Sequence, residues 1–219
     1  MTDSPSGPVG AGSGRSPWAW LGPLLLGGTL ALTIAGGYLI SALAAPLPSP
    51  CQPRVPPISA KGPPRMFINA TRPYFAVIQT SQGSFVVRLY PQDAPVTVNN
   101  FIDLACNNFY NGLLFFRVQK FVVQTGDPTN SGTSGVPYSL PGEANYENWD
   151  VGAVGMAASK QSGISGSQFF VLKQADQYLA NQNTAGTFNR FGQVIRGMAV
   201  VDRLTVNSKI TSIRISGAP

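Results

Sequence analysis

The stretch FFRVQKFVVQTGDPTNSGTSG (residues 115–135) carries the pattern on which the fold assignment rests. It holds two short apolar runs, Phe115–Val118 and Phe121–Gln124, followed by a segment rich in Gly, Ser, Thr, Asn and Pro. Short runs of aromatic and β-branched residues bounded by turn-forming residues are typical of β-strands. The stretch therefore predicts two short strands, and a surface loop is expected over Pro128–Tyr146.

Similar runs lie on both sides of this stretch. Further strands are predicted at Phe75–Gln79, Ser84–Leu89, Val151–Met156, Gln168–Leu172, Phe191–Ile195 and Ile210–Ile215. A helix is predicted to open at Pro95, because Val98, Phe101, Ile102 and Ala105 form one apolar stripe. A second helix is predicted near Met198–Leu204. Many short strands with two helices predict a mainly-β domain built as a closed antiparallel barrel.

The composition excludes most kinds of catalytic site. The 219 residues include no histidine, which excludes Ser-His-Asp triads, Cys-His pairs, histidine-ligated zinc and imidazole acid–base catalysis. The two cysteines, Cys51 and Cys106, are too few for a thiolate metal site and form no CxxC pair. Because Cys51 lies in a Pro-rich stretch far along the chain from Cys106, the sequence favours unpaired cysteines over a disulfide. We expect no cofactor and no metal.

The charge distribution gives little support to nucleic-acid binding. Fifteen Lys+Arg residues against nine Asp+Glu residues give a formal net charge of +6. Residues 1–65 hold four basic and one acidic residue, and residues 66–219 hold eleven and eight, so each part carries +3. Neither part has a block of like charge, whereas a surface that follows phosphates needs clustered Lys and Arg.

The N-terminal part differs in composition from the rest. Residues 1–15 are small, polar and rich in Gly, Ser and Pro, which predicts a disordered tail. Leu21–Ala45 is apolar over 25 residues, and about 20 such residues cross the hydrocarbon core of a bilayer. Residues 16–45 are therefore predicted to form one hydrophobic helix, either a single-pass membrane anchor or a cleaved signal segment.

Between this segment and the β-rich domain lies a Pro-rich linker, residues 46–72. Pro46–Pro64 contains eight prolines, and such stretches act as extended, semi-rigid spacers. The domain itself is predicted over residues 73–219. Because the apolar segment stands at the N-terminus of the sequence, we expect the domain on the non-cytoplasmic side of a membrane.

Four segments resemble a known family in their order and spacing. They are GSFVVRLYPQDAPVTVNNFIDLA (83–105), FFRVQKFVVQTGDPTNSGTSG (115–135), VGMAASKQSGISGSQFFVL (154–172) and FGQVIRGMAVVDRL (191–204). The chain resembles the cyclophilin-type peptidyl-prolyl cis-trans isomerases over Pro73–Ser216. The resemblance implies the family's fold, a closed eight-stranded antiparallel barrel capped by two helices.

The same resemblance implies a site. Arg117 matches the family's catalytic arginine, and Phe121 and Gln124 match two residues that act beside it. The implied substrate-binding residues are Val122, Met156, Ala157, Ala158, Gln168, Phe170, Tyr178, Leu179 and Phe188. In the GDPT turn, Asp127 and Thr129 are expected to shape the loop rather than to act on a substrate.

The implied reaction suits a chain without histidine. Rotation about an X–Pro peptide bond makes and breaks no covalent bond, so it needs no nucleophile, base, metal or cofactor. The resemblance implies an isomerase that acts on proline-containing polypeptide segments and assists protein folding at a membrane. Phe116, Tyr178 and Phe188 depart from the family pattern. The loop at residues 180–188 is longer than the corresponding loop of the family. The alternative is a catalytically weak binding or scaffold module in a membrane protein complex.

Overall fold

The computed structural model describes residues 51, 62–144, 147–179 and 187–218. The chain divides into two compact units, Met1–Ala45 and Pro46–Pro219, and every described residue belongs to the second. The predicted tail and hydrophobic helix, residues 1–45, lie outside the described residues. No helix in the described part is long and apolar enough to cross a membrane. The membrane anchor therefore stays a prediction.

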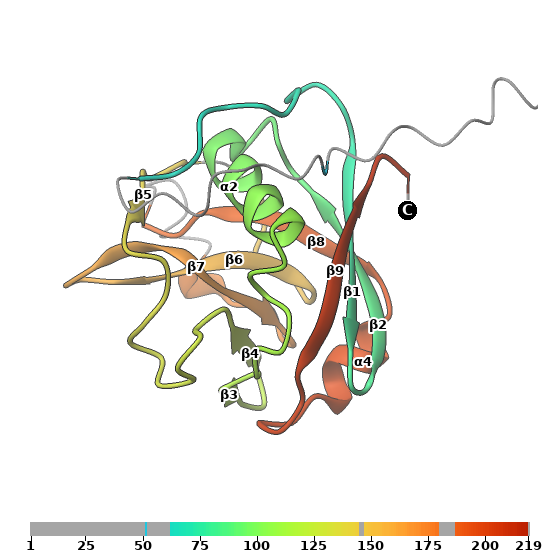
Figure 1. Cartoon of the computed structure of the whole chain (residues 1–219). Coiled ribbons are helices and arrows are strands. Elements are labelled where there is room, and N and C mark those ends of the chain that lie inside the picture. The colour runs from blue at the N-terminus through green and yellow to red at the C-terminus, as the bar shows by residue number, and fades with distance from the viewer. Residues whose placement is uncertain (1–50, 52–61, 145–146, 180–186, 219) are drawn as a thin grey trace, which may run out of the picture. The chain divides into compact units, whose positions relative to one another are not determined.

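One antiparallel sheet forms the framework of the described unit (Figure 1). Eight of its strands follow one path in the order β3-β4-β7-β6-β8-β2-β1-β9, and β5 pairs with β7 off this path. The strands are β1 (Tyr74–Thr80), β2 (Gly83–Leu89), β3 (Arg117–Val118), β4 (Val122–Thr125), β5 (Ser139–Leu140), β6 (Ala153–Ser159), β7 (Gly163–Leu172), β8 (Arg190–Arg196) and β9 (Ile210–Ser216). The helices are α2 (Pro95–Cys106) and α4 (Met198–Arg203). The prediction of a mainly-β domain with helices is confirmed for this part of the chain.

The sheet is an open, curled half-barrel, which corrects the predicted closed barrel. The two ends of the strand path, β3 and β9, do not pair as strands in the described residues. They approach through a single bridge between Leu114 and Lys209. The chain before this bridge runs through turns in which Asn108 and Gly112 take positive φ values of 59° and 84°. Backbone hydrogen bonds flank this bridge, from Gly112 N to Ile210 O (2.7 Å), from Ile210 N to Leu113 O (2.9 Å) and from Phe115 N to Ser208 O (3.0 Å), but the two strands themselves form no ladder in the described residues.

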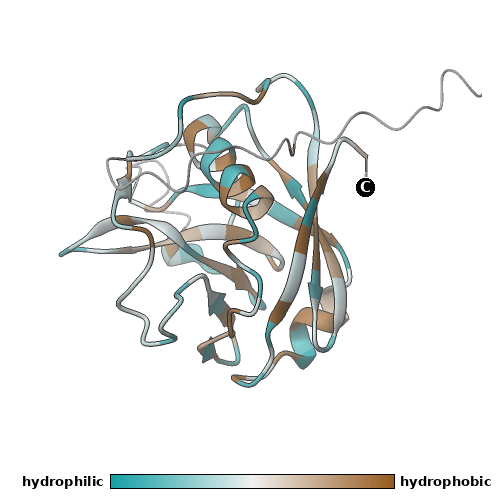
Figure 2. Ribbon diagram, in the orientation of Figure 1, coloured by the Kyte–Doolittle hydropathy of each residue, from teal (hydrophilic) through white to brown (hydrophobic). Residues whose placement is uncertain are grey.

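Helix α2 packs against the sheet through its apolar stripe, as predicted. Val98, Phe101, Ile102 and Ala105 are all buried, and in Figure 2 the helix alternates between apolar and polar positions. Pro95 stands in its first turn, where the missing N–H of proline costs no intrahelical bond. The carboxylate of Glu143 accepts hydrogen bonds from the backbone N–H groups of Val96 (2.7 Å) and Thr97 (2.9 Å). It thereby caps the helix from a distant loop and holds that loop on the helix.

Two apolar clusters make up the core. The larger one fills the space between α2 and the sheet, where the rings of Phe101, Tyr110, Phe169 and Phe191 meet at centroid distances of 5.2–6.5 Å. The smaller one consists of buried residues on β4, β6, β7 and the adjoining loops: Val122, Trp149, Ala153, Phe170, Leu172 and Leu179. This smaller cluster underlies the candidate site described below.

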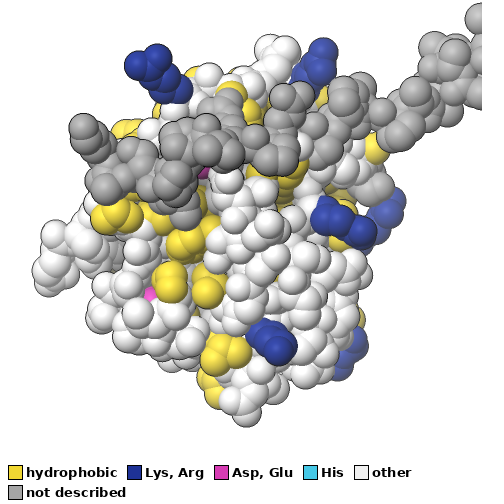
Figure 3. All heavy atoms as spheres, viewed as in Figure 1, with side chains coloured by type: hydrophobic (Ala, Val, Ile, Leu, Met, Phe, Trp, Pro, Cys, Tyr) yellow, Lys and Arg dark blue, Asp and Glu magenta, His cyan; other side chains and the backbone are white. Residues whose placement is uncertain are grey.

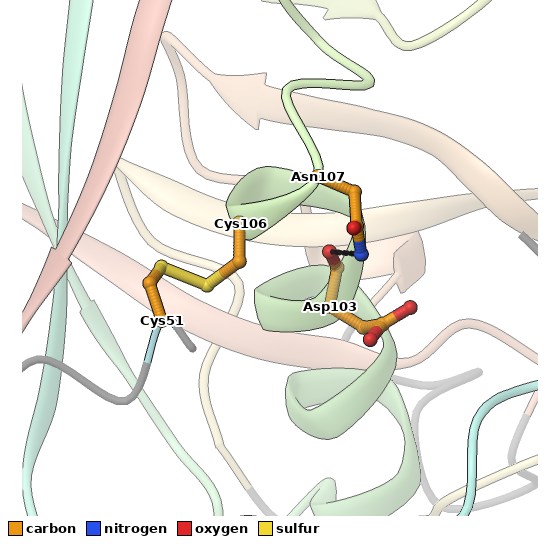
Figure 4. Close-up of a disulfide and its surroundings, with 4 residues drawn as sticks. All are labelled: Cys51, Asp103, Cys106 and Asn107. Carbon is orange, nitrogen blue, oxygen red and sulfur yellow. Dashed lines mark hydrogen bonds between the residues drawn. A yellow bond between two sulfur atoms is a disulfide. The ribbon is translucent and has the colours of Figure 1, made fainter. Parts of the chain in front are cut away.

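Cys51 and Cys106 form a disulfide, which contradicts the prediction of unpaired cysteines (Figure 4). Their Cα atoms lie 5.1 Å apart although 55 positions separate them in sequence. The prediction was wrong because sequence distance does not measure spatial distance. The chain after the Pro-rich stretch returns to α2, where the side chain of Asn99 accepts hydrogen bonds from the N–H groups of Phe67 (2.9 Å) and Ile68 (3.3 Å).

The described part of the predicted linker therefore contacts the domain. The amide of Asn99 also donates to the carbonyl oxygens of Pro64 and Arg65, both at 3.2 Å. One buried side chain thus holds four backbone groups of residues 64–68 on α2, and the disulfide holds Cys51 at the end of the same helix. The predicted boundary at residue 73 stays a prediction, but the tie to the domain begins well before it.

Basic side chains are spread out on the face that contains α2. Figure 3 shows the Lys and Arg side chains of this face at several separate places rather than as one continuous patch. This distribution matches the scattered positions of basic residues in the sequence.

Candidate functional site

Strands β3 and β4 bring Arg117 and Gln124 side by side. The two residues are direct partners in the antiparallel pair, and Arg117 Nη1 donates a hydrogen bond of 3.2 Å to Gln124 Oε1. Arg117 Nε donates to Gln119 Oε1 at 3.0 Å, and the guanidinium carbon lies 5.7 Å from the centroid of the Phe121 ring. These contacts hold the exposed Arg117 side chain over the start of β4.

A chain of amide groups continues inward from Arg117. Gln124 Nε2 donates to Gln168 Oε1 at 2.9 Å, and Gln168 Nε2 donates to the carbonyl oxygen of Ser134 at 2.6 Å. Gln124 and Gln168 are 8% and 6% exposed, so both amides are nearly buried. Because each amide has its oxygen and its nitrogen engaged, the two side chains have fixed orientations. Arg117 therefore rests on a rigid polar support.

An open hollow of about 550 Å³ lies next to this support. Volumes of about 300–1,000 Å³ are usual for ligand sites. Its wall is mainly apolar and comes from β4, β7 and three connecting segments: Phe116, Phe121, Val122, Phe170, Leu172, Leu179 and Phe188. Arg117 and Gln124 stand at the same hollow, so hydrogen-bond donors adjoin an apolar surface.

Most of the residues implied by the resemblance meet at this hollow. Those that line it are Arg117, Phe121, Val122, Gln124, Ala157, Ala158, Phe170, Leu179 and Phe188. Ala157 and Ala158 are neighbours in sequence, yet both reach it because the β6–β7 register shifts between Met156 and Ala158. Gln168 lies directly behind Gln124 and lines a neighbouring hollow.

Met156 and Tyr178 are not among the residues that line this hollow. Met156 is completely buried in the larger core cluster, opposite the equally buried Phe169 across β6 and β7. Its side chain points to the opposite face of the sheet from the hollow, because successive strand residues alternate faces. The Tyr178 side chain is 68% exposed and lines neither of the two hollows.

Several lining residues were not predicted from the sequence. Leu172 follows Phe170 by two positions on β7, so strand alternation alone predicts that both face one side. Ser131, Gly132 and Asp176 come from loops, and no periodic pattern marks them. Asp176 has a positioning role, since its Oδ1 accepts hydrogen bonds from the N–H groups of Tyr178 (2.9 Å) and Leu179 (3.2 Å).

A second hollow of about 600 Å³ is continuous with the first. The two share Gln124, Gly132, Ala157 and Ala158. The second is lined by hydroxyl, amide and glycine residues together with Val136, Pro137 and the two alanines, from the β4–β5 loop, the β6–β7 turn and the adjoining strands, and none of its described lining residues is charged. In Figure 1 the β4–β5 loop runs along one side of the molecule from β4 to β5.

Asp127 organises the loop between the hollows, as predicted. Its carboxylate accepts hydrogen bonds from the N–H of Thr129 (2.7 Å), the hydroxyl of Thr129 (2.8 Å) and the N–H of Ser134 (3.1 Å). Burial raises the pKa of Asp127, but hydrogen bonds from Thr129, Ser134 and Gly132 outweigh burial and hold it below the ordinary 3.8. The fold therefore prefers the ionised carboxylate.

We expect Asp127→Asn to lower the free energy of unfolding at neutral pH by about 2 kcal/mol, since hydrogen bonds to charged groups contribute about 1.5–3 kcal/mol. The folded pKa lies below the unfolded one, so this contribution exists above 3.8 and disappears as the pH falls through the folded pKa. Urea unfolding of both proteins along a pH series measures it. The difference should shrink in acid, whereas the exposed control Asp150→Asn should show little difference throughout. A difference that does not change with pH would contradict the assignment.

The described residues offer hydrogen bonding and apolar contact rather than metal ligation. No three His, Cys, Asp or Glu side chains in this part of the chain converge on a possible metal position. Arg117 has five N–H donors, and contacts within the described part engage Nε and Nη1. The remaining donors can reach a carbonyl oxygen or an amide nitrogen held in the hollow.

Comparison with known proteins adds to this geometry. A family model described as "Cyclophilin type peptidyl-prolyl cis-trans isomerase/CLD" matches residues 75–216. The chain is 39% identical over 133 residues to peptidyl-prolyl cis-trans isomerase-like 1 of Aspergillus oryzae, covering 57% of this chain and 78% of that protein. It is 36% identical over 133 residues to peptidyl-prolyl cis-trans isomerase CYP18-2 of Arabidopsis thaliana, covering 58% and 77%.

Solved structures show the same fold. The crystal structure of a Cryptosporidium parvum cyclophilin-type peptidyl-prolyl cis-trans isomerase matches with a TM-score of 0.60 and 24% identity, and the match covers 67% of this chain and 99% of that one. The shared fold is the curled antiparallel half-barrel with helices described above.

Proposed function

The chain belongs to the cyclophilin-type peptidyl-prolyl cis-trans isomerase family and shares its isomerase activity, and we propose that Arg117 is the catalytic residue. The substrates are proline-containing polypeptides. In this proposal the apolar hollow holds the proline ring, while the polar support beneath Arg117 fixes the guanidinium beside the rotating bond.

The chemistry follows from the electronic structure of the peptide bond. Resonance gives the C–N bond partial double-bond character and a rotation barrier of about 18–20 kcal/mol. When the bond twists, the nitrogen lone pair is no longer delocalised and becomes a hydrogen-bond acceptor. A guanidinium N–H aimed at that nitrogen interacts more strongly with the twisted state than with either planar state. Only such a difference accelerates the reaction.

One observation carries the proposal: the exposed guanidinium of Arg117 lies at a mainly apolar hollow. Its contacts in the described residues engage only Nε and Nη1 as hydrogen-bond donors. Phe121, Phe170 and Leu179 offer ring-sized apolar contact. Gln124 and Gln168 restrict the position of Arg117, so little reorganisation is needed when the bond twists. Preorganised donors of this kind are the main source of electrostatic catalysis.

The test is acceleration of cis-to-trans isomerisation of a proline-containing tetrapeptide by the full chain. We expect a first-order rate that rises in proportion to protein concentration. A folded chain that binds the peptide without changing this rate would instead be the binding module of the alternative hypothesis.

We also propose that the domain works outside the cytoplasm, where it assists folding near the membrane that residues 16–45 would span. The Cys51–Cys106 disulfide supports an oxidising compartment, because disulfides are rare where glutathione and thioredoxin keep thiols reduced. The uncharged apolar run Leu21–Ala45 supports membrane attachment.

Cell fractionation with alkaline extraction, followed by alkylation and electrophoresis without reductant, tests this location. We expect the chain in the extraction-resistant membrane fraction, with Cys51 and Cys106 protected from alkylation. A chain found in the cytoplasmic fraction with both thiols alkylated would contradict the proposal.

A further inference from the structure

Trp149 lies behind the pocket wall rather than in it. Its side chain is 2% exposed and belongs to the smaller core cluster. Its ring is stacked on Phe170, with a centroid distance of 5.5 Å and an interplanar angle of 17°, and meets Phe188 edge-on at 6.5 Å. Phe170 and Phe188 also meet each other edge-on at 6.3 Å. Two of these three rings line the hollow, and Trp149 supports both from beneath.

Gly155 provides the space that the tryptophan ring occupies. It is the direct partner of Phe170 across β6 and β7. A Cβ atom at position 155 would lie 2.4 Å from Cη2 and 2.6 Å from Cζ3 of Trp149, and 2.9 Å from Cζ of Phe170. Any side chain at Gly155 must therefore displace the tryptophan, the phenylalanine or both. The strand glycine and the large ring are matched to each other.

Within the described residues, the contacts of the ring are packing contacts. Trp149 Nε1 is buried and has no hydrogen-bond partner within the described part of the chain. A buried unpaired N–H carries a desolvation cost, so a phenylalanine or leucine would serve better if the position only filled the core. The tryptophan ring instead fits the space left by Gly155 and stacks on Phe170.

The backbone of Trp149 supports a third part of the wall. Its carbonyl oxygen accepts a hydrogen bond of 2.9 Å from the N–H of Asp176. The Asp176 carboxylate in turn holds the backbone N–H of Leu179, whose side chain lines the hollow. Trp149 thus connects three separate lining residues: Phe170, Phe188 and Leu179.

From these contacts we infer that Trp149 is a positioning residue that sets the shape of the proline-binding wall through Phe170 and Phe188. The inference rests on the proposed function, because it assigns the hollow to the proline ring. Its specific consequence concerns substrate affinity. Trp149 acts on the apolar wall, whereas Arg117 acts on the twisted bond, so the two residues affect KM and kcat differently.

The test uses the full chain with Trp149→Leu, Trp149→Phe, Gly155→Ala and the double variant Trp149→Phe/Gly155→Ala. For a proline tetrapeptide we expect Trp149→Leu and Gly155→Ala to raise KM at least about fivefold, as expected for losing an aromatic contact of ordinary strength. In the Trp149→Phe background, the Gly155→Ala substitution should raise KM much less. The reason is that the smaller phenylalanine ring lacks the tryptophan atoms Cη2 and Cζ3, which clash with the new Cβ. Peptide affinity measured by NMR titration should follow KM.

The readout separates positioning from folding. Partial unfolding lowers apparent kcat but leaves the KM of the remaining folded molecules unchanged. The matched control is Phe85→Leu, which removes another fully buried aromatic ring, one outside both hollows. It should lower the unfolding midpoint without changing KM.

Two results overturn the inference alone: a KM within twofold of the wild type for Trp149→Leu, or an equal effect of Gly155→Ala in both backgrounds. A wild-type chain that binds the peptide without isomerising it overturns the proposed catalysis, and the peptide affinities of the variants still decide the inference. A wild-type chain that does not bind the peptide overturns both.

Discussion

Arg117→Ala is expected to lower kcat/KM for a proline tetrapeptide by about 10²–10³-fold, the usual effect of removing one preorganised donor from a transition state. The side chain is exposed, and its hydrogen bonds in the described residues go to Gln119 and Gln124. Gln124 keeps its bond to Gln168 when the arginine is removed. The loss should therefore appear mainly in kcat, with the apolar wall and KM little changed.

Two further variants show whether the loss of kcat/KM comes from the guanidinium of Arg117. Arg117→Lys keeps the charge but loses the planar fork of donors, so we expect an activity between those of the wild type and Arg117→Ala. Arg214→Ala is the matched control, because Arg214 is also an exposed strand arginine but lies on β9, outside both hollows. All three variants should unfold at nearly the wild-type urea concentration. If Arg117→Ala keeps kcat/KM within threefold of the wild type, Arg117 is not the catalytic residue.

The sequence predicts those parts of the fold that local periodicity encodes. The stripe of Val98, Phe101, Ile102 and Ala105 on α2 follows the 3.6-residue period of a helix, and all four residues are buried. The hairpin of β1 and β2 follows from two short apolar runs joined by a Ser-Gln-Gly turn, and its register pairs Thr80 with Gly83. Both patterns are local, so no knowledge of distant contacts is needed.

Features that depend on contacts between residues far apart in the sequence cannot be predicted from local patterns. Strand β5 has two residues and exists because it pairs with Ser165 and Ile164 on β7. The bulge on β6, which turns both Ala157 and Ala158 to the hollow, depends on the register with β7. In the sequence, no local pattern distinguishes Trp149 from an aromatic residue that only fills the core. Its role arises only when Gly155 and Phe170 are brought beside it.

The resemblance to a family indicates a region of the fold but not the direction of each side chain. It placed Met156 at the pocket because the family's segment lies there, although strand alternation turns this side chain into the core. It placed Tyr178 there as well, and the residue is largely exposed beside a loop. Matching of segments therefore identifies neighbourhoods, whereas face and register decide which residues contact a ligand.

Loss of the disulfide is the second change with a large expected effect. A cross-link between residues 55 positions apart is expected to stabilise a protein by about 4 kcal/mol, because it restricts the unfolded chain. Cys51→Ser/Cys106→Ser should therefore lower the free energy of unfolding by about that amount. Urea unfolding of the full chain measures the loss, and wild-type protein with reductant should match the double variant. A loss below about 1 kcal/mol would contradict this role.

The effect on activity should be small while the protein remains folded. No residue of α2 lines either hollow, and Cys106 stands at the end of that helix. Asn99→Ala is the comparison variant, since it removes the hydrogen bonds to residues 64–68 but leaves the cross-link. It should lower stability and leave reductant sensitivity intact. The stability of the fold would then depend on the redox state of the compartment. The isomerase activity would depend on the apolar wall and on Arg117. A chain equally stable with and without reductant would remove the main support for an oxidising compartment.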